Sequence, residues 1–331
     1  FKIGNCPDDC FNSAFREFKT ACKTIKALSK SQKDRTGQGF QYPEQLKFKS
    51  KKQGGVKIEI RGRSLTYKPR ERKLYFYPKY FGSDVGVSIK TDLTKLEGLD
   101  DFSYLSLLCL RHGHYYLMIP RLVTGKPSAP PKTVCALDPG VRTFMTGYDP
   151  EGLSFELSPD QDHLNKRKRR IEKLQSSLAK EKNKNTRRRL KKQIQDLYRR
   201  ISNCVDDLHH KTAKLLADSY SQVILPSFAT SEMVKKGERK IGPRTAHEML
   251  TLSHYKFRLL LQHKMEQRGG KLIACSEEYT SKTCGQCGRL NHNLGGSKVF
   301  HCPYSDCQLR IDRDLNGARN IFIMNYNSMD E

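Results

Sequence analysis

The sequence has no tryptophan, and it has no apolar run long enough to cross a membrane as a helix. It also lacks an initiator methionine and a secretory leader, so we expect a soluble intracellular protein from which some native N-terminal sequence is missing. Hydrophobic residues make up only 36% of its 331 residues, which fits two or three domains with modest cores. The 11 cysteines are odd in number, which argues against a simple disulfide framework.

Acidic residues are scarce relative to basic ones. The chain has 35 Asp and Glu against 61 Lys and Arg, which gives a net charge of +26. A surplus of this size is typical of a protein that binds a polyanion, because neutralised phosphates release condensed counterions. A generally basic, soluble protein is the alternative. We predict a nucleic-acid partner.

The chain divides by its hydrophobic patterns. Residues 1–45 have helical spacing, and residues 46–130 form short alternating strands that fit a small antiparallel β-barrel better than a sandwich. Prolines at 127, 130 and 131 mark a linker. After it we expect strands at 134–137, 143–148, 153–157, 222–225 and 271–275, a helical hairpin at 160–220, one continuous helix at 245–268 and a last helix at 315–324. This order is typical of an α/β domain of the RNase H-like type.

The predicted hairpin carries two dense basic runs, at 166–170 and at 187–192. A charged run on a helix is most often a solvated face. Two runs on one hairpin of a strongly basic chain favour a surface that follows a phosphate backbone. A nuclear-import signal at 166–170 is a compatible second use.

Four cysteines near the C-terminus have the spacing of a metal site. Cys284 and Cys287 form a C-x2-C pair, and Cys302 and Cys307 form a C-x4-C pair. Four thiolates complete the tetrahedral shell of a structural zinc ion. His301 could replace one ligand, and four buried free cysteines are the other alternative.

Carboxylates occupy two further positions of interest. Asp138 ends an apolar strand, directly before Pro-Gly, where it could hold a hydrolytic metal or only start a turn. Asp312 and Asp314 begin the last helix, where capping is the simpler interpretation of each residue alone.

Taken together, these motifs resemble a known family. The run at 137–142 (LDPGVR) looks like the first nuclease motif of TnpB and Fanzor proteins, relatives of the type V CRISPR effectors. The run at 279–284 (YTSKTC) resembles their lead into a zinc ribbon, and 312–318 (DRDLNGA) resembles their third nuclease motif. The resemblance covers about residues 131–325, and residues 46–130 resemble the family's wedge domain more loosely.

The resemblance implies an α/β fold with an RNase H-like (RuvC) nuclease domain, an inserted helical hairpin and a zinc ribbon. A short helical segment and a small β-barrel wedge domain precede it. The implied domains are a recognition-lobe remnant at 1–45, the wedge at 46–130, the nuclease at 131–279 with its basic hairpin at 160–220, the zinc ribbon at 280–307 and the rest of the nuclease at 308–331.

Three catalytic carboxylates follow from the resemblance. Asp138 matches the first, and Asp314 the third, with Asp312 a weaker candidate. The TnpB pattern has a glutamate where this chain has Pro226, and Fanzor proteins carry it on a later strand. Glu277 and its neighbour Glu278 match that strand, and we choose Glu277 because it lies two residues before the YTS motif. Without this carboxylate the chain would cut poorly.

The implied activity is hydrolysis of DNA phosphodiester bonds by an RNA-guided endonuclease. Two catalytic Mg²⁺ ions would be held by Asp138, Glu277 and Asp314, and structural Zn²⁺ by the four cysteines. The partners are a guide RNA (omega RNA) and double-stranded target DNA with a short flanking motif, with no membrane. The location is the nucleus in a eukaryote, or else a prokaryotic cytoplasm or a viral factory. The alternatives are a bacterial transposon TnpB nuclease, an RNA-guided DNA-binding protein with a decayed nuclease, and a DNA-joining transposase.

Overall fold

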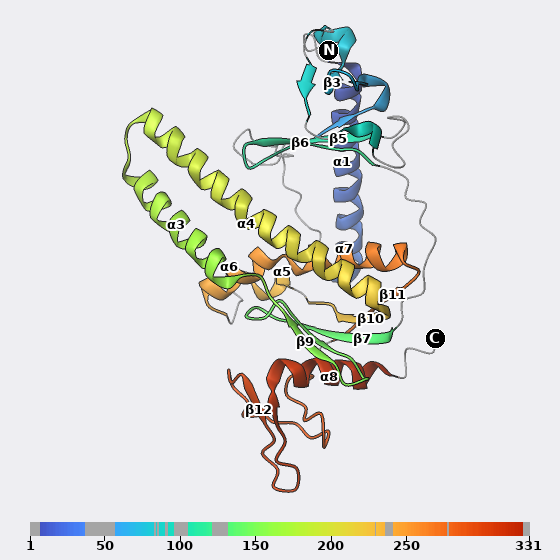
Figure 1. The fold of residues 1–331 in the computed structure, drawn as a ribbon, viewed down its shortest axis with the longest axis vertical. Helices are drawn as coiled ribbons and strands as arrows, with labels where there is room; N and C mark the ends of the chain where they lie inside the picture. Colours follow the sequence, from blue (N-terminus) through green and yellow to red (C-terminus); the bar gives the residue numbers. More distant parts are fainter. Residues whose placement is uncertain are drawn as a thin grey trace. The chain divides into compact units, whose positions relative to one another are not determined.

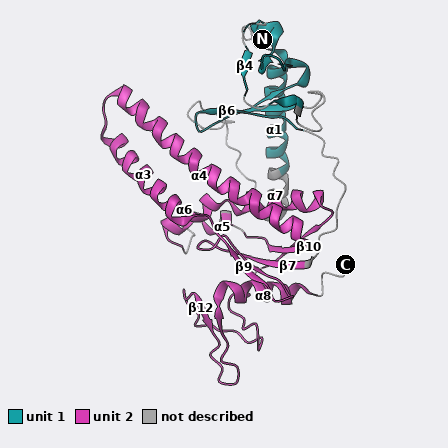
Figure 2. Cartoon of the chain, viewed as in Figure 1, with its two compact units in different colours: residues 1–124 teal, residues 125–331 magenta. Residues whose placement is uncertain are grey.

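The computed structural model describes residues 7–36, 57–82, 84, 86–89, 92–95, 105–120, 132–228, 230–235, 241–276 and 278–326. The chain divides into two compact units, residues 1–124 and 125–331 (Figure 2). Both α-helices and β-strands occur in each, so the mixed α/β content expected from the sequence is confirmed. No helix of the described residues is both long enough and apolar enough to cross a lipid bilayer.

The N-terminal unit contains one long helix and two small sheets (Figure 1). Asp9, in the first turn of the long helix, forms ion pairs with Arg63 at 2.9 Å and Arg61 at 3.4 Å. In the described part of this unit no strand pairing closes the two sheets into one, so the barrel stays a prediction. The elements are α1 (Asp8–Thr36) and α2 (Pro78–Phe81), the antiparallel sheet of β1 (Lys57–Ile60), β5 (Ser106–Arg111) and β6 (His114–Met118), and the antiparallel sheet of β2 (Leu65–Lys68), β3 (Lys73–Phe76) and β4 (Gly86–Ser88).

The second unit is organised by a five-stranded mixed sheet in the order β11-β10-β7-β8-β9. Strands β7, β8 and β9 follow one another in sequence and form an antiparallel meander. Strands β10 and β11 are parallel to β7. The strands are β7 (Lys132–Pro139), β8 (Met145–Tyr148), β9 (Ser154–Leu157), β10 (Tyr220–Pro226) and β11 (Lys271–Cys275), close to the ranges predicted from the sequence.

Alternate residues of β7 pack against different helices. Cys135 and Leu137 belong to the main core, which includes Leu216 of α4 (Lys184–Ser219) and Phe257 of α7 (His254–Gln267). Ala136 lies in a second cluster with Ile321 of α8 (Arg313–Asn325). The sheet is therefore covered by α4 and α7 on one face and by α8 on the other (Figure 1).

The predicted hairpin is present as α3 (Gln161–Lys180) and α4 (Lys184–Ser219). Asp160 and Asn183 accept hydrogen bonds from backbone amides at the two helix starts, as N-cap residues do. Arg187 donates from Nη1 to the carbonyls of Leu178 at 2.9 Å and Glu181 at 2.7 Å. One residue of the basic runs therefore has a structural role, because it satisfies carbonyls at the end of α3.

The prediction of one continuous helix over 245–268 is wrong at Ser253. The chain forms α6 (Pro243–Leu252) and α7 (His254–Gln267), and Ser253 between them has a left-handed φ of 50°. His209 of α4 makes a 2.9 Å hydrogen bond with the carbonyl of Leu252, so a carbonyl at the end of α6 gains a partner from outside the helix. The break also turns His254 into the core. A short helix, α5 (Thr230–Met233), precedes this pair.

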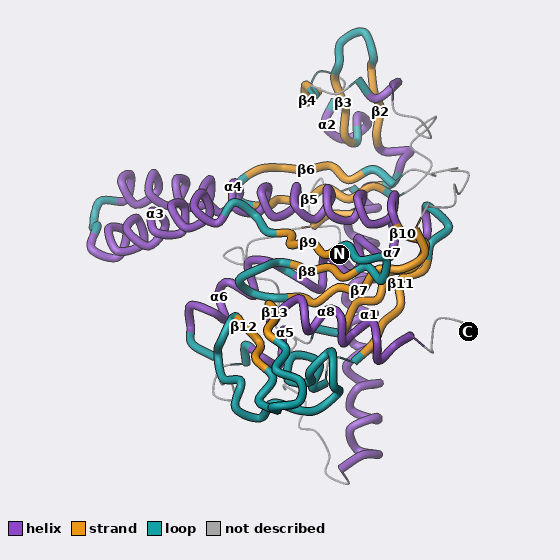
Figure 3. Tube along the Cα trace, turned by 60° about the horizontal axis from the view of Figure 1, so that its bottom comes forward, coloured by secondary structure: helices purple, strands orange, loops and turns teal. Residues whose placement is uncertain are grey.

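The C-terminal part begins with residues 280–312, called here the cysteine-rich segment. It contains two paired strands, β12 (Val299–His301) and β13 (Arg310–Asp312). β13 leads directly into α8, the helix predicted over 315–324. In a second view α8 lies along β7 and β8, next to the cysteine-rich segment (Figure 3).

Candidate active site and metal centre

Asp138 lies near the end of β7, on the sheet face that α8 covers. It pairs with Thr146 on β8, and Thr146 pairs with Glu156 on β9. Residues directly opposite each other in antiparallel strands have their side chains on one face. Asp138 follows Ala136 by two residues in β7, so the two side chains lie on the same face of the sheet. Ala136 packs in one cluster with Ile321 of α8. A carboxylate, a hydroxyl and a second carboxylate therefore form a row that faces this helix.

The first turn of α8 contributes the next carboxylate. Asp312 caps the helix, because its Oδ1 accepts hydrogen bonds from the amides of Asp314 at 2.9 Å and Leu315 at 3.1 Å. Burial raises the pKa of Asp314, the negative charges of Asp312 and Glu156 raise it further, and nearby cations oppose them. Asp312 thus has the capping function considered from the sequence, and Asp314 is a half-buried carboxylate among like charges.

Gly317 brings α8 and Asp138 into close contact. A Cβ atom placed on Gly317 would lie 2.5 Å from Oδ2 of Asp138, a separation that real Cβ atoms do not adopt. Only glycine permits this approach, although glycine within a helix is less favourable than alanine by about 1 kcal/mol. The sequence offered one signal for this residue, a glycine in the middle of a helix.

Two buried asparagines connect α8 to the start of the cysteine-rich segment. Asn316 accepts from the amide of Gly285 at 3.0 Å and donates to the carbonyl of Thr283 at 2.7 Å. Asn320 donates to the carbonyls of Thr280 at 2.8 Å and Thr283 at 2.7 Å. One helix therefore carries Asp314, contacts Asp138 and fixes the loop before the first cysteine pair. Sequence reasoning did not identify these asparagines.

The four predicted cysteines are brought together. Their sulfur atoms all lie within 4.8 Å of one another, and two pairs, Cys284 with Cys307 and Cys287 with Cys302, are separated by 3.7 Å. A tetrahedral zinc ion with bonds of about 2.3 Å needs sulfurs about 3.8 Å apart. The donor set therefore fits zinc. His301 is exposed and is not part of this group.

The environment of the cluster favours the thiolate of Cys287, whereas burial raises the pKa of Cys302, and burial and the other thiols raise the pKa of Cys307. The backbone amide and the guanidinium of Arg289 lower the pKa of Cys287 to about 6. Arg289 is held by an ion pair with Asp306 and lies 4.0 Å from the ring centroid of Tyr304. Phe300 is fully buried against the cysteines, so the segment has a small core of its own.

Glu277 lies outside the described residues. Its neighbour Glu278 is exposed. In the described part of the chain the four cysteines form the only group of three or more candidate ligands whose donor atoms lie this close together. The structure therefore brings Asp138 near the helix that carries Asp314, and among the described residues no three carboxylates lie as close together as the four cysteines do.

Thr146 is a further residue of this face that was not predicted from the sequence. Its side chain is 2% exposed, and its hydroxyl has no hydrogen-bond partner in the described structure. A buried unpaired hydroxyl costs about 1–3 kcal/mol unless something occupies the space beside it. Its position between Asp138 and Glu156 adds an oxygen to the row that faces α8.

Two family models match segments of this chain. Residues 254–321 match a model described as "Cas12f1-like, TNB domain", and residues 114–236 match one described as "Probable transposase". The first covers the cysteine cluster and the start of α8. The second covers Asp138 and the basic hairpin.

Relatives of the chain include viral and bacterial proteins. "Putative transposase A625R" of Paramecium bursaria Chlorella virus 1 is 32% identical over 64% of this chain and 48% of its own length. "TnpB-like protein L79" of Acanthamoeba polyphaga mimivirus is 28% identical over 62% and 40%. "Putative RNA-guided DNA endonuclease InsQ" of Escherichia coli (strain K12) is 27% identical over 63% and 53%. The chain thus spans about half of each relative.

Among solved structures, the "Cryo-EM structure of the Cas12f1-sgRNA-target DNA complex" contains a similar fold. The TM-score is 0.50 at 18% identity, over 81% of this chain and 59% of the other. Residues 114–236 are therefore similar to a transposase model and residues 254–321 to a Cas12f1-like TNB domain, in a chain that is similar to TnpB-like proteins.

Proposed function

We propose that this chain is the nuclease part of an RNA-guided DNA endonuclease with an RNase H-like (RuvC) domain. The single observation that carries the proposal is the contact between Asp138 and α8. That contact puts a carboxylate of the central strand against the helix whose first turn carries Asp314. The named activities of the relatives support the same class of reaction.

In this proposal Asp138 and Asp314 hold magnesium. Carboxylate oxygens are the ligands that this hard cation prefers. The raised pKa of Asp314, caused by burial and by like charges, indicates a place where a cation would lower the energy of the ionised form. Bound there, magnesium would activate the scissile phosphodiester and the attacking water. Thr146 would bond a ligand at this face, and Asp312 would keep α8 in position.

Glu277 remains the proposed third carboxylate. β11 ends at Cys275, which is the register partner of Pro226 on β10 and packs in the cluster beneath α8. Glu277 follows Cys275 by two residues in the sequence, so a carboxylate comes shortly after the end of this strand. Pro226 has no side-chain oxygen, so a carboxylate at this edge has to come from the neighbouring strand.

The partners in the proposal are a guide RNA of the omega type and double-stranded DNA. The exposed basic residues of α3 and α4 would follow a phosphate backbone, since neutralised phosphates release counterions. The four cysteines would hold structural zinc beside α8. Viral relatives favour a Fanzor-type protein acting in a nucleus or a viral factory, and the bacterial relative keeps a TnpB nuclease of a prokaryotic cytoplasm as the alternative.

The test uses the RNA that co-purifies with the chain. That RNA is sequenced, and a plasmid with the matching target and a randomised flank is incubated with the complex and Mg²⁺. We expect cleavage by the wild type and by Asp162→Asn, an exposed control carboxylate, and none by Asp138→Asn. Equal cleavage by Asp138→Asn would remove Asp138 from the site.

The adjacent pair Glu277→Gln and Glu278→Gln provides a matched comparison, and only the first should stop cleavage. One other function is an RNA-guided binder without nuclease activity. Pro226 favours it, because the TnpB pattern has a catalytic glutamate at this position and proline cannot hold a metal. Target binding without cleavage by any form, over a range of Mg²⁺, would establish that second function.

A further inference from the structure

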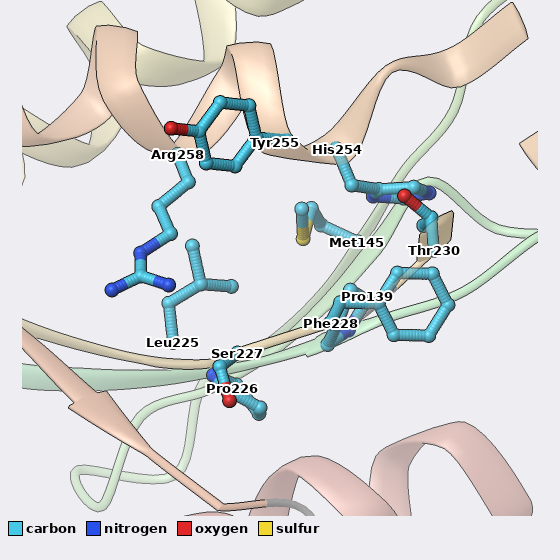
Figure 4. A pocket seen from close by; sticks show the side chains of 10 residues that line it. All are labelled: Pro139, Met145, Leu225, Pro226, Ser227, Phe228, Thr230, His254, Tyr255 and Arg258. Carbon is cyan, nitrogen blue, oxygen red and sulfur yellow. The ribbon is translucent and has the colours of Figure 1, made fainter. Parts of the chain in front are cut away.

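A pocket of about 460 Å³ opens at the carboxyl ends of β7 and β10 (Figure 4). Its volume falls in the range of about 300–1,000 Å³ that small-molecule sites occupy. Leu225 and Met145 in its lining belong to the core on the α7 face of the sheet. Pro139, also in the lining, directly follows Asp138 in β7. The pocket therefore lies across the sheet from α8, one residue away from the candidate carboxylate.

Aromatic and basic side chains line this pocket. His254, Tyr255 and Arg258 come from the first turns of α7. His254 and Arg258 are one helical turn apart, so they lie on the same side of the helix. The Tyr255 side chain is 66% exposed. In Figure 4 the Arg258 guanidinium and the Tyr255 ring lie on one side of the pocket, and Phe228 lies on the other.

His254 supplies the second observation. It is only 3% exposed, and neither ring nitrogen makes a hydrogen bond of ordinary geometry in the described structure, although the backbone of Gly140 lies near enough to oppose the lowering of its pKa. Phe144 stacks on its ring at 5.1 Å, and Phe228 meets it edge-on at 4.9 Å. Burial lowers the pKa of His254 to about 4, so the ring is neutral at physiological pH. A neutral imidazole offers one donor and one acceptor.

These features select the chemistry of the ligand. A phosphate offers only acceptors, so it would leave the acceptor nitrogen of a neutral His254 unpaired. The edge of a nucleobase offers donors and acceptors together, and its face stacks on aromatic rings. The guanidinium of Arg258 can neutralise a phosphate beside that base. A base in a duplex cannot enter such a pocket without leaving the stack.

We infer that this pocket holds one unpaired base of the DNA strand, next to the phosphate at Asp138. The inference rests on the proposed nuclease function, because the DNA strand is assigned to this pocket only if Asp138 holds its phosphate. Pro139 lines the pocket and directly follows Asp138. The base would fix the position of the strand along the sheet edge, so it would determine which phosphate lies between β7 and α8.

The test measures binding and cleavage separately. Short fluorescein-labelled single-stranded DNAs, each with one abasic position, are titrated by anisotropy against full-length protein carrying Asp138→Asn, so that the DNA stays intact. We expect one abasic position to weaken binding about tenfold, as loss of one stacked base does. Tyr255→Ala should weaken binding to the intact strand by a similar factor and should remove the effect of that abasic position, as coupled groups do.

Leu259→Ala is the matched control, since Leu259 is 50% exposed on the same helix and does not line the pocket. The loss of binding free energy caused by Leu259→Ala should simply add to the loss caused by the abasic position. His254→Phe keeps an aromatic ring against Phe144 but removes both nitrogens, so it should reduce the preference between bases at the coupled position. Melting temperatures confirm that each variant is folded.

Absence of any abasic position that couples to Tyr255→Ala would overturn the inference. Coupling found only with an RNA strand of the same sequence would overturn the assignment to DNA. Cleavage by protein without Asp138→Asn is scored independently. If an abasic position couples to Tyr255→Ala but no DNA is cut, the base-binding pocket is supported and the proposed nuclease activity is rejected. If DNA is cut but no abasic position couples to Tyr255→Ala, only the base-binding pocket is rejected.

Discussion

Replacement of Gly317 by alanine tests the geometry of the proposed nuclease site directly. The new Cβ would lie 2.5 Å from Oδ2 of Asp138, and ordinary contact begins at 3.4 Å. The carboxylate or α8 must therefore move by nearly 1 Å. A displacement of that size in a catalytic group costs about 100-fold in rate. Alanine also favours the helix by about 1 kcal/mol, so lost activity would not require lost helix stability.

The assay is single-turnover cleavage of the guide-matched plasmid, with RNA and DNA binding measured in parallel. Gly296→Ala is the matched control, because nothing lies within 4 Å of a Cβ at that position and its φ is not left-handed. We expect Gly317→Ala to bind nucleic acid like the wild type and to cut about 100-fold more slowly. Wild-type cutting by Gly317→Ala would show that the position of Asp138 against α8 does not matter for the reaction.

Five other substitutions address separate parts of the structure. Cys284→Ser should release zinc, measured by elemental analysis of the purified protein, and unchanged zinc content would reject the assignment. Asn320→Ala removes the donor to the buried carbonyl of Thr280 and one of the two donors to the carbonyl of Thr283, which keeps Asn316, so the free energy of unfolding should fall by about 1–3 kcal/mol in urea titration; a smaller change would mean that water replaces the amide. Arg187→Ala should destabilise the hairpin with little effect on RNA binding, because Arg187 bonds carbonyls at the end of α3. Arg188→Ala, at an exposed position, should leave stability unchanged and should reduce the slope of log binding constant against log salt concentration by up to about 0.9. The reverse pattern would contradict both assignments. Asp314→Asn should raise stability at neutral pH in EDTA, because a carboxyl whose pKa is raised by folding favours the folded state at low pH and loses that contribution as pH rises through the raised value; thermal melts at neutral pH and near pH 4 check the sign.

The strands of the second unit were predictable because their apolar residues alternate between two covered faces. Val134 and Ala136 pack on one side and Cys135 and Leu137 on the other, which gives a short continuous apolar run in the sequence. The break at Ser253 was not predictable. The apolar spacing continues through it, and the partner that stabilises the new end, His209, is distant in sequence.

The cysteine cluster followed from spacing alone, since two short-range pairs limit the ligand geometry before folding is considered. The carboxylates were different. Asp138 and Asp314 are far apart in the sequence, and each had a simpler explanation as a turn or helix-start residue. That Asp138 faces the helix carrying Asp314 depends on α8 lying across β7, which depends in turn on Gly317 having no side chain.

By itself, the sequence determined the charge, the zinc-type ligand set and the order of strands and helices, because these depend on composition and on contacts between near neighbours. The tertiary structure decided which side chains share a face. It placed Thr146 and Glu156 in the row of Asp138, joined Asn316 and Asn320 to the cysteine-rich segment, and enclosed His254 between the rings of Phe144 and Phe228. Such contacts join residues remote in sequence, and no periodicity of the chain records them.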